Sequence, residues 1–173
     1  LPIWPVIDLV DTTYEKLYTN VDHQRAVVFV RPDYYVVFDR ATGQEPHKMG
    51  LNFWLTPPEL TIDQAAGTVN SNEPDGANVL IKLADPSGVE ITERKGTVDL
   101  KEERSDIPVV TFWKKSVSNA EFATVLYPYP EGKSAPAVNT SQVSVGPFRV
   151  VDITTPQGAD HVFYCASWPR YTM

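Results

Sequence analysis

The sequence lacks the features that define several large classes of protein. Cys165 is the one cysteine, so neither an intramolecular disulfide framework nor a multi-cysteine metal site is possible. Basic runs are also missing: 15 Lys and Arg stand against 22 Asp and Glu, a formal net charge of −7. We therefore expect no nucleic-acid partner. No apolar run approaches the roughly 20 residues of a membrane helix, and we expect no membrane partner.

The N-terminus has neither an initiating methionine nor the pattern of a signal peptide. It reads LPIWP, without a basic flank followed by an apolar stretch. We interpret the chain as a processed protein or a piece of a longer one.

Helical patterns are scarce, whereas strand and turn patterns recur. The 15 prolines disfavour a long helical bundle, because proline ends helices and central strands. With 42% hydrophobic residues, 173 residues suffice for one domain with a core. The sequence predicts an all-β fold, an antiparallel β-sandwich of short strands with proline-rich turns. The single domain would span residues 1–173, with residues 1–20 as an N-terminal lead-in segment.

Three hairpins are predicted from apolar runs on either side of turn sequences. A short helical turn is the only helix we expect, at 59–66. The first hairpin is apolar on both faces near its middle, so we expect a second layer to pack on it. The predicted hairpins join 26–30 to 34–38, 78–84 to 89–92, and 148–154 to 161–165.

No catalytic or metal-binding motif is present. The three histidines, His23, His47 and His161, have no motif spacing and could form a metal site only if the fold brought them together. A nucleophile elbow, a phosphate loop and a zinc-protease motif are all missing. Cys165 ends an apolar strand and is interpreted as a buried, inert thiol. We predict no catalytic residue, no metal and no cofactor.

Four residues are candidates for binding a carbohydrate. Tyr127 and Tyr129, in the segment YPYP, stand at a strand exit where an exposed ring could stack on a sugar, although packing in the core is the commoner fate. Arg25 has the bidentate fork that suits a uronate carboxylate, and His47 precedes an aromatic strand. Trp54 and Trp113 lie in mid-strand and are interpreted as core residues.

Three segments together resemble the heparinase II/III-like polysaccharide lyases. They are residues 25–40 (RAVVFVRPDYYVVFDR), 122–132 (FATVLYPYPEG) and 148–163 (FRVVDITTPQGADHVF). Their order and approximate spacing match a C-terminal β-sandwich region of that family.

The resemblance implies a parent enzyme with an α/α-toroid upstream of the sheets. Such enzymes cleave uronic-acid polysaccharides by β-elimination, in which a base removes the C5 proton while the carboxylate charge is neutralised. Their catalytic Asn or His, Tyr and His lie upstream of the matched segments, and the H-x-H-x-D pattern is missing here. The resemblance therefore implies no catalytic residue in this chain, and a periplasmic or secreted parent.

Three functions remain open. The first is a non-catalytic C-terminal β-sandwich domain that supports the upstream toroid and catalytic sheet of such a lyase and is not active alone. The second is a stand-alone carbohydrate-binding module for an acidic polysaccharide. The third is a metal-dependent lyase or epimerase. A supporting domain predicts an exposed apolar surface where the upstream domains would dock.

Overall fold

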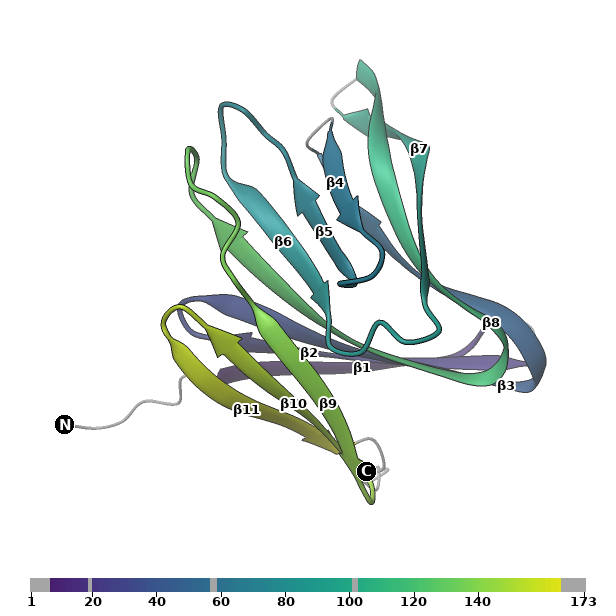
Figure 1. Ribbon diagram of the computed structural model, residues 1–173. Coiled ribbons are helices and arrows are strands. Elements are labelled where there is room, and N and C mark those ends of the chain that lie inside the picture. Colours follow the sequence, from purple (N-terminus) through teal and green to yellow (C-terminus); the bar gives the residue numbers. More distant parts are fainter. Residues whose placement is uncertain (1–6, 19, 57–58, 101–102, 166–173) are drawn as a thin grey trace.

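The computed structural model describes residues 7–18, 20–56, 59–100 and 103–165, and these form strands and turns only (Figure 1). None of them forms a helix long and apolar enough to cross a membrane. The strands are β1 (Ile7–Tyr18), β2 (Val21–Val30), β3 (Tyr34–Trp54), β4 (Leu60–Asp63), β5 (Thr68–Ser71), β6 (Asn78–Leu83), β7 (Glu90–Leu100), β8 (Glu103–Tyr129), β9 (Asn139–Val145), β10 (Phe148–Thr155) and β11 (Gly158–Cys165).

The strands form two antiparallel sheets, as the all-β sandwich prediction required. Sheet A has the order β1-β2-β3-β8-β6-β5-β4, with β7 paired to β8. Sheet B has the order β11-β10-β9. Part of the expected lead-in segment, residues 7–18, is β1 and pairs with β2 in sheet A.

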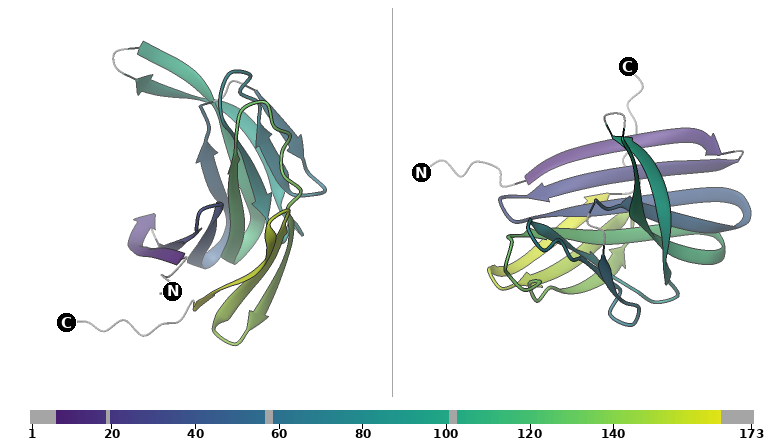
Figure 2. Two further views of the ribbon diagram at one scale, coloured as in Figure 1. Left: turned by 90° about the vertical axis from the view of Figure 1, so that its left-hand side faces the viewer. Right: turned by 90° about the horizontal axis from the view of Figure 1, so that it is seen from above.

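Two long strands bend sheet A into two halves. The pairing of β3 with β8 shifts register between Thr42 and Met49, and Ser116 on β8 has a left-handed backbone with φ of 54°. At a register shift one strand has more residues than its partner. These extra residues leave part of the ladder unpaired and bend the strands. The first half of β8 and the second half of β3, with β7, thereby turn away from the rest of the sheet (Figure 2).

The core has two layers, one on each face of the central strands. On one face, Phe38 and Val125 pack under Val151 and Ile153 of sheet B. On the other face, buried residues that include Ile81 pack against the turned-back half of β3, β7 and β8. The expected cover on both faces of the 26–30 and 34–38 hairpin is confirmed only in part, because Tyr35 is 37% exposed.

Two local predictions are wrong. The segment 59–66 contains β4 rather than a helical turn, since Leu60–Asp63 finds an antiparallel partner in β5. The predicted hairpin of 78–84 with 89–92 does not form either. Its turn at 85–88 instead carries the chain from β6 to β7, which pair with opposite halves of β8. A turn sequence fixes the local reversal but not which strand becomes the partner.

Candidate functional site

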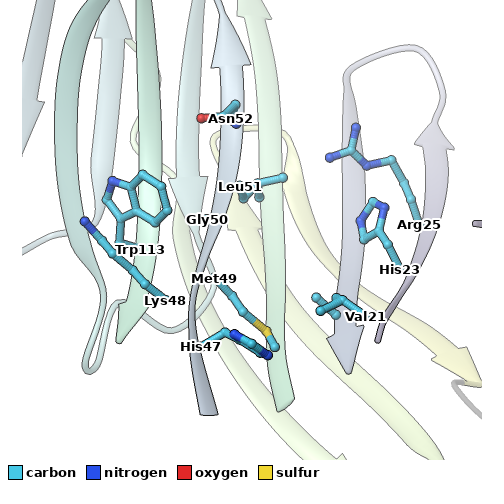
Figure 3. A pocket seen from close by; sticks show the side chains of 11 residues that line it. Val21, His23, Arg25, His47, Lys48, Met49, Gly50, Leu51, Asn52 and Trp113 are labelled. Carbon is cyan, nitrogen blue, oxygen red and sulfur yellow. The ribbon is translucent and has the colours of Figure 1, made fainter. Parts of the chain in front are cut away.

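A cavity of about 510 Å³ lies at the bend of sheet A, between β2 and the second half of β3 (Figure 3). Its position follows from the pairing. The β2–β3 ladder ends at Gly43, and beyond it β3 pairs with β8 alone among the described strands. No described strand pairs with this edge of the second half of β3, and the edge forms one wall of the cavity. The lining residues are Val21, His23, Arg25, Ala41, residues 47–52 and Trp113.

Asp39 organises the β2 wall. The residue is 5% exposed, and its Oδ1 accepts a hydrogen bond from Arg25 Nε at 2.7 Å. His23 Nε2 lies 2.8 Å from the same oxygen. The register explains the cluster, because Arg25 and Asp39 are directly opposed and His23 is two residues along on the same face. The buried carboxylate therefore holds both basic side chains in place beside the cavity.

Trp113 and Lys48 form the opposite wall. A Cβ at Gly50 would lie 2.4 Å from the Trp113 ring, so the indole rests directly on this glycine. The indole Nε1 donates to Thr92 Oγ1 at 2.9 Å, and Lys48 Nζ lies 4.0 Å from a ring centroid, within cation–π range. A glycine inside a strand often marks such a close approach, which is the signal in the sequence that could have identified this wall.

The cavity lining is rich in basic side chains. Arg25 and Lys48 line it together with His23 and His47, and one of these groups, Arg25, is paired with the carboxylate of Asp39. The chain as a whole carries a net charge of −7, so this local excess of basic side chains runs against the overall charge. The arrangement suits an anionic group such as a carboxylate or sulfate.

The four predicted ligand-binding residues separate into two pairs. Arg25 and His47 come together, since both line the cavity. Tyr127 and Tyr129 are 6% and 8% exposed and belong to the core next to sheet B. Their hydroxyls donate to Gln157 Oε1 at 2.8 Å and to the carbonyl of Ser71 at 3.3 Å. Burial raises the pKa of both phenols. Neither ring is placed to stack on a sugar in solution.

The prediction that Trp54 and Trp113 are core residues is wrong for both, since neither belongs to a buried core cluster. Trp54 is 49% exposed, and Trp113 is half-buried beside the cavity. Both lie on the outer face of the second half of sheet A, which no described element covers. Mid-strand position did not predict burial because this half has a partner layer on one face only.

The histidines are divided between two parts of the molecule. His23 and His47 line the cavity, whereas His161 is exposed on sheet B, where its Nδ1 lies 2.7 Å from Asp152 Oδ1. Within the described residues, no three His, Cys, Asp or Glu side chains gather as metal ligands. Cys165 is half-buried at the end of β11.

Comparisons with known proteins match the chain to lyases. No family model matches. A heparin-sulfate lyase from Pedobacter heparinus is 29% identical over 126 residues, covering 70% of this chain and 19% of the relative. A heparin-sulfate lyase from Bacteroides stercoris is 22% identical over 130 residues, covering 73% of this chain and 20% of the relative. The chain thus spans about a fifth of the length of the curated relatives that it matches.

Solved structures of the same kind share the fold. Heparan sulfate lyase HepC from Pedobacter heparinus has a TM-score of 0.81 at 22% identity, covering 95% of this chain and 27% of that one. A heparinase III gene product has a TM-score of 0.79 at 20% identity, covering 92% and 26%. The predicted resemblance is therefore confirmed: in sequence and in fold, the chain corresponds to a region of the heparinase-like lyases.

Proposed function

We propose that the chain is a non-catalytic β-sandwich domain of a longer heparinase-like polysaccharide lyase, in which it supports the catalytic domains. The matched relatives are about five times longer than the region they share with this chain. The resemblance assigns the catalytic groups to segments upstream of that region. The parent would degrade an acidic, uronate-containing polysaccharide, in the periplasm or outside the cell.

The observation that carries this proposal is the outer face of sheet B. Phe163 is 68% exposed, Val145 59%, Val143 51% and Phe148 41%. Phe148 is paired with Val145, and Val150 is paired with both Val143 and Phe163, so these side chains share one face. Contiguous apolar surface of this kind is typical of an interaction site.

The rest of the lyase is the occupant that we assign to this face. Burying one phenylalanine or valine side chain contributes about 1.5–3 kcal/mol, so four exposed positions are a large unused source of binding free energy. Asp152 and His161 lie on the same face beyond the apolar residues and form a polar rim. An apolar centre with a polar rim is the usual anatomy of a protein interface.

The test is the absorbance of unsaturated uronate, the product of β-elimination. The chain is incubated alone with heparan sulfate, and the full-length lyase serves as the positive control. We expect new absorbance with the full-length lyase and none with the chain alone. Product formed by the chain alone, and lost in a His23→Ala or His47→Ala variant, would overturn the non-catalytic assignment.

A stand-alone carbohydrate-binding module is the second candidate, and the cavity favours it. Arg25 and His47 come from β2 and from the bend of β3, yet both line the same cavity. A uronate carboxylate could bind there. Titration of the chain with heparan sulfate oligosaccharides should then give binding that weakens in Arg25→Lys, which keeps the charge but loses the bidentate fork. If the unaltered chain and Arg25→Lys bind the oligosaccharides with equal affinity, the cavity is not the binding site.

A further inference from the structure

The outer face of the second half of sheet A carries two tryptophan rings, each lying across a glycine. Trp113 covers Gly50 on β3, and a Cβ at that glycine would lie 2.4 Å from the ring. Trp54 reaches across β8 to Gly96 on β7, where a Cβ would lie 2.5 Å from its ring. Glycine in the interior of a strand lowers the stability of the sheet, so each of these two close approaches of an indole to a glycine has a cost in stability. Alternate residues of β3, β7 and β8 share this surface, which we call the indole face: Lys48, Gly50, Asn52, Trp54, Glu90, Thr92, Arg94, Gly96, Val109, Thr111, Trp113 and Lys115.

Packing of the sheet accounts for only part of this arrangement. The Trp54 ring shields Val109, which is fully buried. Yet 49% of Trp54 remains accessible, and no described element covers this face. The indole Nε1 of Trp113 is held by Thr92. The rings are thus fixed by the fold and still reachable from solvent.

Basic side chains accompany both rings. Lys48 Nζ lies 4.0 Å from the Trp113 ring centroid, and the Arg94 guanidinium carbon lies 5.4 Å from that of Trp54. The one acidic residue on the indole face is Glu90, which is paired with Lys115 Nζ at 2.7 Å. The indole face is therefore positively charged on an acidic chain.

We propose that the indole face binds a strand of acidic polysaccharide. Flat indoles suit the C–H faces of pyranose rings, and Lys48 and Arg94 suit their carboxylate or sulfate groups. Trp113 and Val109, which is the partner of Trp54, lie four positions apart on β8, about 13 Å along the strand, a distance that a short oligosaccharide spans. The chemistry disfavours an acidic peptide, which has no rigid flat faces, and the net charge disfavours nucleic acid.

This inference goes beyond the proposed function, since it holds whether or not sheet B docks on other domains. The indole face also lies apart from the β2 wall of the cavity. Only Lys48, Gly50, Asn52 and Trp113 are common to the indole face and the cavity. Variants at Trp54 and Arg94 therefore separate this site from the cavity and from the apolar face of sheet B.

The test is a calorimetric titration of the chain with size-defined heparan sulfate oligosaccharides. We expect Trp54→Ala and Arg94→Gln each to weaken binding at least tenfold. Arg94→Gln removes only an exposed charge outside the cavity and should not disturb folding. Phe163→Ser, which removes an exposed ring elsewhere, should bind with unchanged affinity, and dextran should not bind.

Several outcomes would overturn the proposal. Unchanged affinity in both variants would do so, as would binding that is lost only in Arg25 or His47 variants, because the cavity alone would then be the site. Equal affinity for a single-stranded DNA oligonucleotide would reject the assigned ligand class. None of these results affects the docking of sheet B, which is measured separately.

Discussion

Charged and polar side chains tie sheet B to sheet A at specific points. Arg149 on β10 binds Glu121 on β8 through two hydrogen bonds, Nε to Oε2 at 2.5 Å and Nη2 to Oε1 at 2.8 Å. Tyr34 on β3 donates to Asp160 Oδ2 on β11 at 2.6 Å. Each contact joins residues that are distant in sequence, so it helps to fix how the sheets are placed on each other.

Glu121→Gln should lower the free energy of unfolding by about 1–3 kcal/mol at neutral pH, because it breaks a half-buried bidentate pair. Arg149 holds the pKa of Glu121 below its ordinary value of 4.5. Because the pKa of Glu121 is lower in the folded chain than in the unfolded chain, the ion pair stabilises the fold fully above the ordinary pKa. This stabilisation is lost as the pH falls through the folded-state pKa. The free energies of unfolding of the unaltered chain and of Glu121→Gln should therefore converge in acid.

Urea unfolding at a series of pH values measures this effect. Glu131→Gln, in the exposed connection after β8, is the matched control and should stay within about 0.5 kcal/mol. A Glu121→Gln effect that is the same at every pH would contradict the role given to the ion pair.

Tyr34→Phe and Tyr35→Phe form a second matched pair at adjacent positions. Tyr34 is 1% exposed, and burial together with the hydrogen bond to Asp160 raises its pKa. Removing its hydroxyl should cost about 1–2 kcal/mol of unfolding free energy. Tyr35 is 37% exposed, and its variant should unfold like the unaltered chain. Equal effects at the two positions would show that the Asp160 contact contributes no stability.

Individual strands were largely predictable, but their partners were not. Alternating apolar residues and turn sequences located the hairpins of β2 with β3 and of β10 with β11. The bend of β3 and β8 depends on a register shift between segments about 70 residues apart. The failed hairpin after Leu83 has the same cause, because β8 competes for both strands.

The two faces of sheet B should respond differently to truncation. Ile153 is 1% exposed and packs toward sheet A, so Ile153→Ala should cost about 2–5 kcal/mol through the cavity it leaves. Val143 is 51% exposed on the other face, and Val143→Ala should change the free energy of unfolding by no more than about 0.5 kcal/mol. Chemical denaturation of both variants checks this. Comparable losses would mean that the faces have been assigned wrongly.

The candidate site could be predicted only in part, because it forms where the whole chain folds back. Arg25 and His47 were identified by residue type, yet only the bend of β3 brings them to one cavity. Asp39, which positions Arg25, was missed because nothing local marks a buried carboxylate. Tyr127 and Tyr129 were named for their place at a strand exit, where the neighbouring strands bury them.

The most direct test of the proposed function is to compare Phe163→Ser in the chain alone and in the full-length lyase. In the chain alone Phe163 is 68% exposed, so its free energy of unfolding should change by no more than about 0.5 kcal/mol. In the full-length lyase the same change should remove about 2 kcal/mol of interface burial and lower the first thermal transition by several degrees. The same small effect in both proteins would contradict the account, because the outer face of sheet B would then be solvent-exposed in the lyase as well.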